Sequence, residues 1–312
     1  MLHELAVEAE AAGTRLDVWL ESRLEGCSRS LVARSIKAGR CRVEPGRTKP
    51  GYRLRGGERV ALEVEEVPAL TVVPEPMALR ILHEDDALLV LDKPAGVVVH
   101  PAIGHIRGTL LGGLLAYAQQ GGSGWAPLLV HRLDADTSGV MAVAKTPAAQ
   151  AACQDAFRER RVGKRYCALV HGQPQADYFD HHGWIGRSRR DFRKRRVWPE
   201  GTSGARAAHS EFHVRARGHG FSVLEVRIHT GRTHQIRVHL ADLGHPCLAD
   251  ARYGREAEWS PPGDTGPPLT RQALHAWRLA LPHPDGSVLT VTAAPPPDLD
   301  RFLPPGLEPL PA

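Results

Sequence analysis

The sequence predicts an α+β protein whose main domain contains a mixed, largely antiparallel sheet, preceded by a small domain of two helices and a strand pair. Several segments alternate apolar and polar residues and few have helical spacing, a balance typical of α+β folds. The segment 66–77 contains three prolines and is predicted to be an extended linker. It divides the chain into predicted domains at 1–65 and 78–312, and 312 residues suffice for more than one domain.

The small domain is predicted from the spacing of its apolar residues. A first helix is followed by a second, which should begin after the N-cap Ser28 and end at Gly39. Alternation interrupted by glycine-containing turns over residues 41–64 predicts the strand pair. The side chains expected to face the core from the two helices are those of Leu16, Trp19, Leu20, Leu24, Leu31, Val32 and Ile36.

The strands of the main domain are predicted from apolar runs and from alternation. Runs at 80–83 and 87–91 predict two strands. Residues 224–229 alternate Leu, Val and Ile with Glu, Arg and His, which is the pattern of a half-buried strand.

Two helices of the main domain are predicted from their end signals. Residues 146–147 (Thr-Pro) suit the N-cap and first position of a helix that should continue to about Arg161. Another helix should run from about Thr233 to Gly244. The tail after Ala293 is rich in Pro and Leu and is predicted to fray.

Composition narrows the function classes. The net charge of +5 suits a polyanionic partner such as RNA. The five cysteines are scattered and lack CxxC spacing, which argues against a disulfide framework and for a reducing compartment. The first residues do not resemble a signal peptide, and no apolar run is long enough to span a membrane. We therefore expect a cytoplasmic protein, monomeric and without a membrane partner.

The most informative stretch runs from His131 to Gly139 (HRLDADTSG). Asp134 follows an arginine by two residues and precedes a Thr-Ser-Gly turn, with apolar runs on both sides. Such a loop holds a carboxylate at the mouth of a sheet, where functional residues are common. The plainer interpretation is an aspartate that caps backbone amides of the turn.

This stretch resembles the active-site signature of the RluA-type pseudouridine synthases, which isomerise uridine in structured RNA. Residues 1–65 resemble an S4 (α-L) RNA-binding module, and further segments resemble other motifs of the family in the family's order. Together they cover nearly the whole chain. These segments begin at Leu91 (LDKPAGVVVHPAIGHIRGTLL), Gly163 (GKRYCALVHG), Thr230 (TGRTHQIRVHLADLGHP) and Arg271 (RQALHAWRLALPHP).

The resemblance implies roles for four residues. Asp134 would be the catalytic carboxylate, acting as nucleophile or as base toward the sugar, and Arg237 would keep it ionised in a dry pocket. Tyr166 would stack on a uracil that has left the RNA stack, and Arg132 would fill the gap. The plainer alternatives are a surface Arg237, a core Tyr166 and an Arg132 that braces its loop.

RNA contacts are expected from both domains. The segment 187–196 (RSRRDFRKRR) contains seven basic residues and one acid, a composition that suits phosphate contacts, although it could be an ordinary solvated charge run. Arg232 would hold its loop or a phosphate. The RNA-binding candidates are Arg15, Arg29, Lys37 and Arg40 in the small domain, and Arg189, Arg193, Lys194 and Arg232 in the main domain.

No cofactor is expected. The chain has no phosphate-cradling glycine loop, so neither a nucleotide nor a dinucleotide cofactor is predicted. Its densest histidine groups are His181 with His182, and His229 with His234 and His239; their spacing matches no zinc motif, and no carboxylate or cysteine completes a set. We therefore predict no metal site.

The leading hypothesis is a pseudouridine synthase acting on structured RNA, most of all large-subunit (23S) ribosomal RNA. Two alternatives stay open: a catalytically lapsed RNA-binding or ribosome-assembly protein, and the same chemistry on tRNA. Retention of Asp134, Tyr166 and Arg237 favours an active enzyme. One departure from the family pattern is Ala249, where glycine is usual before Asp250, and we expect a small backbone shift there.

Overall fold

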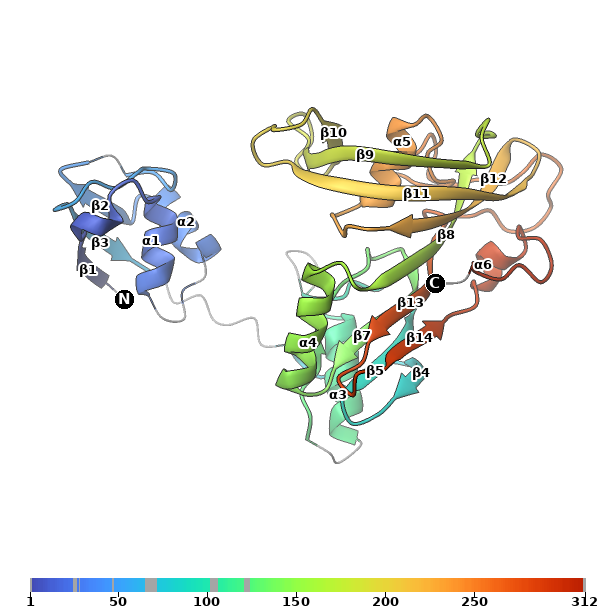
Figure 1. Ribbon diagram of the computed structural model, residues 1–312, viewed down its shortest axis with the longest axis horizontal. Coiled ribbons are helices and arrows are strands. Elements are labelled where there is room, and N and C mark those ends of the chain that lie inside the picture. The colour runs from blue at the N-terminus through green and yellow to red at the C-terminus, as the bar shows by residue number, and fades with distance from the viewer. Residues whose placement is uncertain are drawn as a thin grey trace. The chain divides into compact units, whose positions relative to one another are not determined.

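The computed structural model describes residues 2–24, 27, 29–46, 48–64, 72–101, 106–120 and 124–310. The chain divides into two compact units, Met1–Thr71 and Val72–Ala312 (Figure 1). Residues 72–77, from the segment expected to be a linker, lie against the larger unit: Glu75 N donates a hydrogen bond to Gly112 O (3.1 Å), and Met77 packs in that unit's core. The rest of the described residues after 77 belong to the same unit.

In its described residues the small unit contains two α-helices, a short 3₁₀ helix and a three-stranded antiparallel sheet in the order β1-β3-β2. Both predicted helices are present and pack on this sheet, but the predicted strand pair lacked β1. No residue of β1 is buried, so apolar alternation does not mark it. The predicted N-cap Ser28 lies outside the described residues. The elements are β1 (Leu2–Ala6), the 3₁₀ helix η1 (Ala9–Ala11), α1 (Leu16–Arg23), α2 (Arg29–Lys37), β2 (Cys41–Glu44) and β3 (Arg59–Glu63).

An eleven-stranded sheet forms the large unit, in the order β10-β9-β11-β12-β8-β13-β7-β5-β4, with β14 beside β13 and β6 beside β7. Its described pairings are antiparallel except that of β7 with β13, which confirms a mixed, largely antiparallel sheet. β13 lies between β7 and β8 and so joins the two halves of the sheet (Figure 1). The strands are β4 (Arg80–Glu84), β5 (Leu88–Lys93), β6 (Leu128–Leu129), β7 (Ser138–Ala144), β8 (Gly163–His171), β9 (Tyr178–Arg187), β10 (Arg195–Trp198), β11 (Arg206–Arg217), β12 (Phe221–Ile228), β13 (Leu274–Pro282) and β14 (Val288–Thr292).

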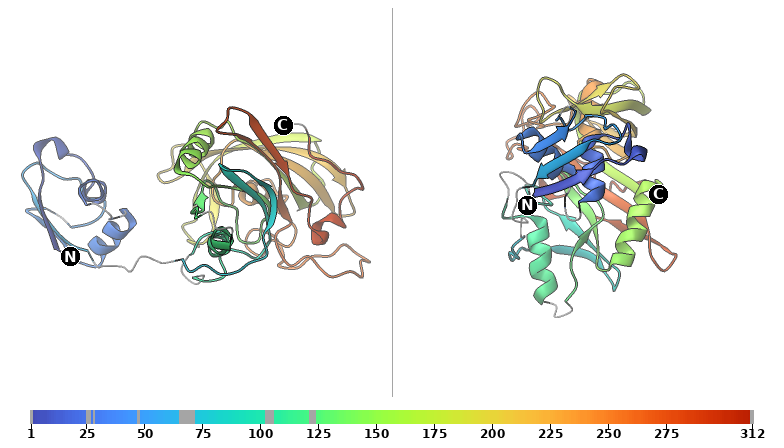
Figure 2. Two further views of the ribbon diagram at one scale, coloured as in Figure 1. Left: turned by 90° about the horizontal axis from the view of Figure 1, so that it is seen from below. Right: turned by 90° about the vertical axis from the view of Figure 1, so that its left-hand side faces the viewer.

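Helices cover both faces of the sheet around β5 and β7. Leu88 and Val90 of β5 pack in one cluster with α4, whereas Leu89 and Leu91 pack in another with α3, because successive strand residues point to opposite faces. Figure 2 shows the strands between these two helices. No helix among the described residues has the length and apolar character needed to cross a bilayer. The helices are α3 (Leu110–Gln120), α4 (Pro147–Arg158), α5 (Gln235–Asp242) and α6 (Pro297–Asp300).

The predicted helix ends agree with the structure to within three residues. Thr146 is the N-cap of α4, its hydroxyl accepting a hydrogen bond from Ala149 N (3.2 Å). The helix ends at Arg158, before Arg160, whose φ of 60° is left-handed. α5 begins at Gln235 because His234 also has a left-handed φ, of 59°.

The C-terminal tail is packed, so the expectation that it frays was wrong. Its apolar side chains cover the face of β8 and β12 opposite α5, and Leu299 is fully buried there. Arg271 forms a bidentate ion pair with Asp298 of α6 (2.7 and 3.0 Å). The tail is rich in Pro and Leu and was therefore expected to be irregular. Its leucines and Phe302 are the side chains that pack it on the sheet.

Glu225 of β12 corrects a second expectation. The strand was predicted to be half-buried, yet Glu225 is fully buried. Arg165 Nη1 donates to one of its carboxylate oxygens (2.8 Å) and Arg215 Nη1 to the other. The amide of Leu310 in the tail also donates to it (2.9 Å). A buried carboxylate needs such partners, which apolar alternation does not reveal.

Candidate active site

Asp134 lies on the loop between β6 and β7, whose Leu133, Thr137 and Ser138 side chains are buried beneath it. Gly139 of β7 has a φ of 116°, and a Cβ there would lie 2.2 Å from Ala276 O on β13. Only glycine allows the two strands to approach this closely. The Thr-Ser-Gly segment therefore fixes the Asp134 loop against the strand at the centre of the sheet.

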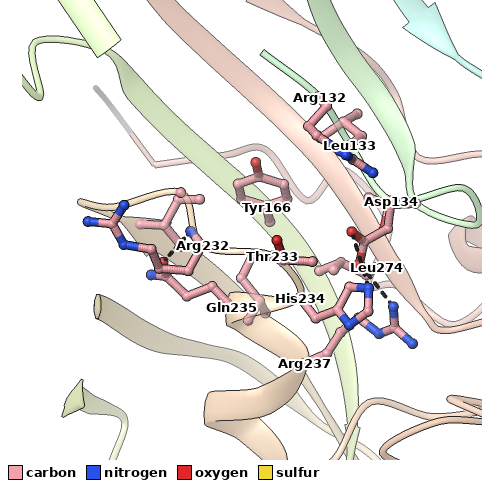
Figure 3. Close-up of a pocket in the computed structure, with 14 residues that line it drawn as sticks. Arg132, Leu133, Asp134, Tyr166, Arg232, Thr233, His234, Gln235, Arg237 and Leu274 are labelled. Atoms are coloured by element: carbon pink, nitrogen blue, oxygen red, sulfur yellow. Dashed lines mark hydrogen bonds and ion pairs between the residues drawn. The ribbon is translucent and has the colours of Figure 1, made fainter. Parts of the chain in front are cut away.

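Arg237, on α5, binds two carboxylates at once, and Figure 3 shows its contact with one of them, Asp134. Its Nη1 donates to Asp134 Oδ2 (2.9 Å), and its Nε and Nη2 donate to the two oxygens of Asp250 (2.7 and 2.8 Å). Asp250 is fully buried and accepts further hydrogen bonds from the amides of Arg252 and Tyr253 (2.9 and 3.0 Å). The Asp134 side chain stays 19% exposed, so one of the two carboxylates can reach a ligand.

Arg237 and Asp250 each stabilise the charged form of the other. Burial alone would lower the pKa of Arg237, but Asp250 and Asp134 raise it above its ordinary value. Burial would likewise raise the pKa of Asp250, but the hydrogen bonds from Arg237 lower it below its ordinary value. The guanidinium therefore stays charged beside Asp134 at neutral pH, and Asp250 holds it in place.

His234 and Tyr253 complete this side of the site, and sequence reasoning assigned a role to neither. His234 Nε2 lies 3.9 Å from Asp134 Oδ1, and burial lowers the pKa of His234 to about 4, so its ring is neutral at pH 7. Its Nδ1 forms a hydrogen bond with the Tyr253 hydroxyl (2.7 Å), which also accepts from Arg195 N (2.8 Å). Donation by this hydroxyl to Nδ1 leaves the ring's Nε2–H facing Asp134.

Tyr166 of β8 lines a cavity of about 120 Å³ together with Asp134, Arg132 and Arg237 (Figure 3). Its ring joins the core cluster under α5 to the one under α3, near the middle of the sheet. Burial, with a contribution from Asp134, raises the pKa of Tyr166, so its hydroxyl stays protonated. The cavity is thus bounded by the ring of Tyr166, the carboxylate of Asp134 and three arginines, Arg132, Arg232 and Arg237.

Arg232 lines the same cavity from the loop before α5, and its Nε donates to Ala207 O of β11 (3.0 Å). Gln235 fixes that loop further, since its Oε1 accepts from Arg232 N (3.0 Å) and its Nε2 donates to His209 O (2.9 Å). The loop that precedes Arg237 is therefore tied to β11. Arg232 supplies one of these contacts, and its predicted role in binding phosphate stays a prediction.

Lys93, at the end of β5, is another supporting residue, besides His234 and Tyr253, that sequence reasoning missed. It is fully buried, and its Nζ donates to three carbonyl oxygens: Pro94 (2.7 Å), Val97 (2.8 Å) and Ala135 (2.8 Å). Burial lowers its pKa to about 8, while Asp136 and Asp134 oppose that shift. Lys93 therefore joins the 94–97 segment to the loop that carries Asp134. Its motif, LDKPAG, was available as a signal.

A larger and more polar hollow of about 450 Å³ adjoins the cavity at Asp134. Arg193 and Lys194, both predicted to bind RNA, line it, as do Arg252 and Arg271. Arg252 Nη1 donates to Arg193 O (2.8 Å). This hydrogen bond holds the basic segment 187–196 beside the site.

The remaining RNA-binding candidates lie elsewhere. Arg189 stacks on Trp198 of β10, 5.0 Å from the ring centroid. In the small unit, Arg15 and Arg29 both bind Asp17 (2.9 and 3.1 Å). Lys37 at the end of α2 is exposed, and Arg40 after it is partly exposed.

The histidines have carboxylate neighbours, contrary to the expectation from sequence spacing. His209 belongs to two groups of possible metal ligands, one with Asp180 and His182 and one with Glu211 and His229. Within each group, the possible ligand atoms all lie within 4.8 Å of one another. The pairing of β11 with β9 on one side and with β12 on the other brings these residues together from distant positions, so spacing along the chain could not reveal them.

Comparisons with known proteins match both units. A family model described as RNA pseudouridylate synthase matches residues 87–242, and an S4-domain model matches residues 14–60. Ribosomal large subunit pseudouridine synthase D of Neisseria meningitidis serogroup B is 40% identical over 306 residues, which cover 96% of this chain and 80% of that protein. The enzyme of the same name from Xanthomonas campestris is 38% identical over 313 residues, covering 97% and 92%.

Two solved human structures have similar folds. RNA pseudouridylate synthase domain containing 1 superposes with a TM-score of 0.57 and 30% identity, covering 73% of this chain and 89% of that one. RNA pseudouridylate synthase domain containing 4 gives a TM-score of 0.59 and 25% identity, covering 71% and 90%.

Proposed function

The chain belongs to the RNA pseudouridylate synthase family, and from this premise we propose that it converts uridines of large-subunit ribosomal RNA to pseudouridine with Asp134 as its catalytic carboxylate. The observation that carries the proposal is the contact between Asp134 Oδ2 and Arg237 Nη1, 2.9 Å, at the junction of the cavity and the polar hollow. The substrate class is taken from the two ribosomal large subunit pseudouridine synthases D that the chain matches along most of its length.

The reaction breaks the glycosidic C–N bond, turns the uracil and joins its C5 to the same ribose carbon; the hydrogen on C5 leaves as a proton, and N1, released from the sugar, takes up a proton. Atoms and electrons balance within the nucleoside. The protein must supply an ionised carboxylate at the sugar, a surface that retains the loose uracil, and a dry site. Asp134, acting as nucleophile or as base, supplies the first, and Arg237 orients it through a hydrogen bond of 2.9 Å, with the neutral His234 alongside.

The two hollows suit a nucleotide that has left its helix. A cavity of about 120 Å³ is below the range of about 300–1,000 Å³ for a whole small molecule, so it suits a single flat base beside Tyr166. The adjoining hollow has guanidinium groups and Lys194 on its walls, which suit ribose and phosphates. Arg132 borders both hollows, where it could fill the gap left in the RNA.

A lapsed, purely RNA-binding protein is the main alternative, and a tRNA substrate is the other. A lapsed enzyme has no need of a carboxylate kept accessible beside a buried guanidinium, so this geometry favours catalysis. The substrate question is separate, because the same site would serve either RNA.

The test of catalysis is tritium release from RNA labelled at uracil C5, with full-length wild type, Asp134→Asn and the control Asp86→Asn. The Asn change at 134 keeps the shape and removes the charge, so release should fall at least about 10³-fold while RNA binding is retained. Asp86, on an exposed turn, should tolerate the same change. Normal release by the Asp134 variant would remove this residue from the mechanism.

The substrate is tested by mapping pseudouridines in ribosomal and transfer RNA from cells with and without the protein. Sites lost only from large-subunit ribosomal RNA support the proposal. If pseudouridines were lost only from tRNA, the substrate would be tRNA in place of ribosomal RNA, and the catalytic assignment would stand.

A further inference from the structure

Three histidine rings stack across neighbouring strands of the sheet, apart from the proposed catalytic residues. His182 of β9 and His209 of β11 are register partners, with ring centroids 3.8 Å apart and planes 17° apart. His229, just after β12, stacks on His209 at 4.3 Å and 9°. Stacked rings direct their in-plane Nε2 lone pairs side by side, so the exposed His182 ring has to turn before it and His209 can bind one ion. Neutral imidazole is the form that binds metals.

Asp180 brings an oxygen to two of these rings. Its Oδ2 lies 3.0 Å from His182 Nε2 and 3.6 Å from His209 Nε2. Ligands bound to zinc at about 2.0–2.2 Å in a tetrahedron are separated by about 3.3–3.5 Å, which these two distances bracket. Within the described part of the chain, His209 Nε2 is buried and has no hydrogen-bond partner. A buried nitrogen without a partner is costly, and a metal ion would satisfy it.

The neighbouring group is less free to bind. His229 Nε2 already forms a hydrogen bond with Glu211 Oε1 (2.7 Å), and Arg227 lies 3.8 Å from the same carboxylate. These residues are therefore better suited to support His209 than to coordinate an ion.

We propose that Asp180, His182 and His209 bind one divalent transition-metal ion, with zinc the best match. Two imidazoles and a carboxylate are a common ligand set for zinc, and the exposed side chain of His182 leaves a fourth position for water. The ion would join β9 to β11. It would act next to the substrate site, because the backbone of His209 accepts a hydrogen bond from Gln235 and donates one to Thr230 (2.9 and 3.0 Å).

The test is titration of untagged, full-length protein with zinc chloride by calorimetry, repeated with cobalt(II) and visible absorption. Wild type should bind one equivalent and give a cobalt spectrum of nitrogen and oxygen ligands, without a thiolate charge-transfer band. Asp180→Asn and His182→Gln change exposed side chains, so folding should survive, and each should weaken binding at least about 100-fold. His219→Gln, in the exposed turn between β11 and β12, is the matched control and should bind as wild type does.

His229→Gln separates the two groups. It should weaken binding by no more than about 10-fold, the lower end for a supporting residue. A loss equal to or larger than that of His182→Gln would move the ion to the Glu211 group and overturn the assignment. Wild-type affinity in the Asp180 and His182 variants, thiolate bands with cobalt, or no binding by wild type would each overturn the site itself.

Discussion

The large unit contains two buried arginine–carboxylate clusters that share chemistry and differ in what they leave open. At Glu225, two arginines and a backbone amide surround one fully buried carboxylate. At Arg237, one guanidinium is shared by two carboxylates, and Asp134 remains partly exposed. The first cluster uses its hydrogen-bonding capacity internally, whereas the second keeps an acceptor for a ligand. An accessible hydrogen-bond acceptor, more than buried charge, is what suits the Arg237 cluster to the proposed catalytic role.

Removing the shared cation should have the largest effect. In Arg237→Met, Asp134 and Asp250 face each other in a dry site without a counter-charge, so turnover should fall at least about 10³-fold and stability by about 3–5 kcal/mol. Urea unfolding and tritium release measure the two. Arg237→Lys is the companion variant, which keeps one charge but not the three directed donors; wild-type turnover in either variant would contradict the role of the guanidinium.

Glu225→Gln should show the opposite profile. Two arginines lose their buried anion, so the unfolding free energy should decrease by about 3 kcal/mol. Turnover per folded molecule should stay near the wild-type value, because Glu225 lies outside both hollows. If Glu225→Gln lost turnover while its unfolding free energy stayed at the wild-type value, the proposed difference between the two clusters would be wrong.

Asp250→Asn should have an intermediate effect. Asp250 positions Arg237 without reaching the ligand, so we expect turnover to fall about 10–100-fold with little change in KM. The folded-state pKa of Asp250 is lowered, so its charge stabilises the native state above the unfolded pKa of about 3.9, and this contribution is lost as pH falls. The stability gap between wild type and variant should therefore be widest near pH 7 and narrow toward pH 3. A gap that does not depend on pH would indicate lost packing alone.

Ala249→Gly should have the smallest effect. Ala249 is buried and has a φ of 52°, a left-handed conformation that costs a non-glycine residue about 1–2 kcal/mol. Glycine relieves that strain but adds freedom to the unfolded chain, so stability should rise by about 0.5–1 kcal/mol with turnover unchanged. Thermal unfolding measures this. A destabilised Gly variant would show that the alanine methyl group contributes more by packing than the backbone loses.

Much of the architecture was predictable because local patterns mark it. The N-cap Thr146, the apolar run of β5 and the alternation in β12 identify elements whose residues are close in sequence. The loop at Asp134 and its pairing with Arg237, 103 positions away, came from a family resemblance and not from periodicity.

Long-range pairings account for what the sequence did not reveal. Lys93 contacts Ala135 across 42 positions, and Asp180 approaches His209 only through the register of β9 with β11. The tail looked irregular because its apolar residues pack on the sheet one by one and form little regular structure. Buried polar partners and irregular segments leave no period to detect.

The position of β13 has a consequence for how the protein is made. This strand, near the end of the chain, inserts between β7 and β8, which are synthesised more than a hundred residues earlier. Until the ribosome has released residues 274–282, the loop with Asp134 and the strand with Tyr166 belong to two separate half-sheets. The nascent chain therefore has two unpaired strand edges until β13 is made, a period in which exposed edges favour aggregation, and the pocket is completed only when β13 pairs with both.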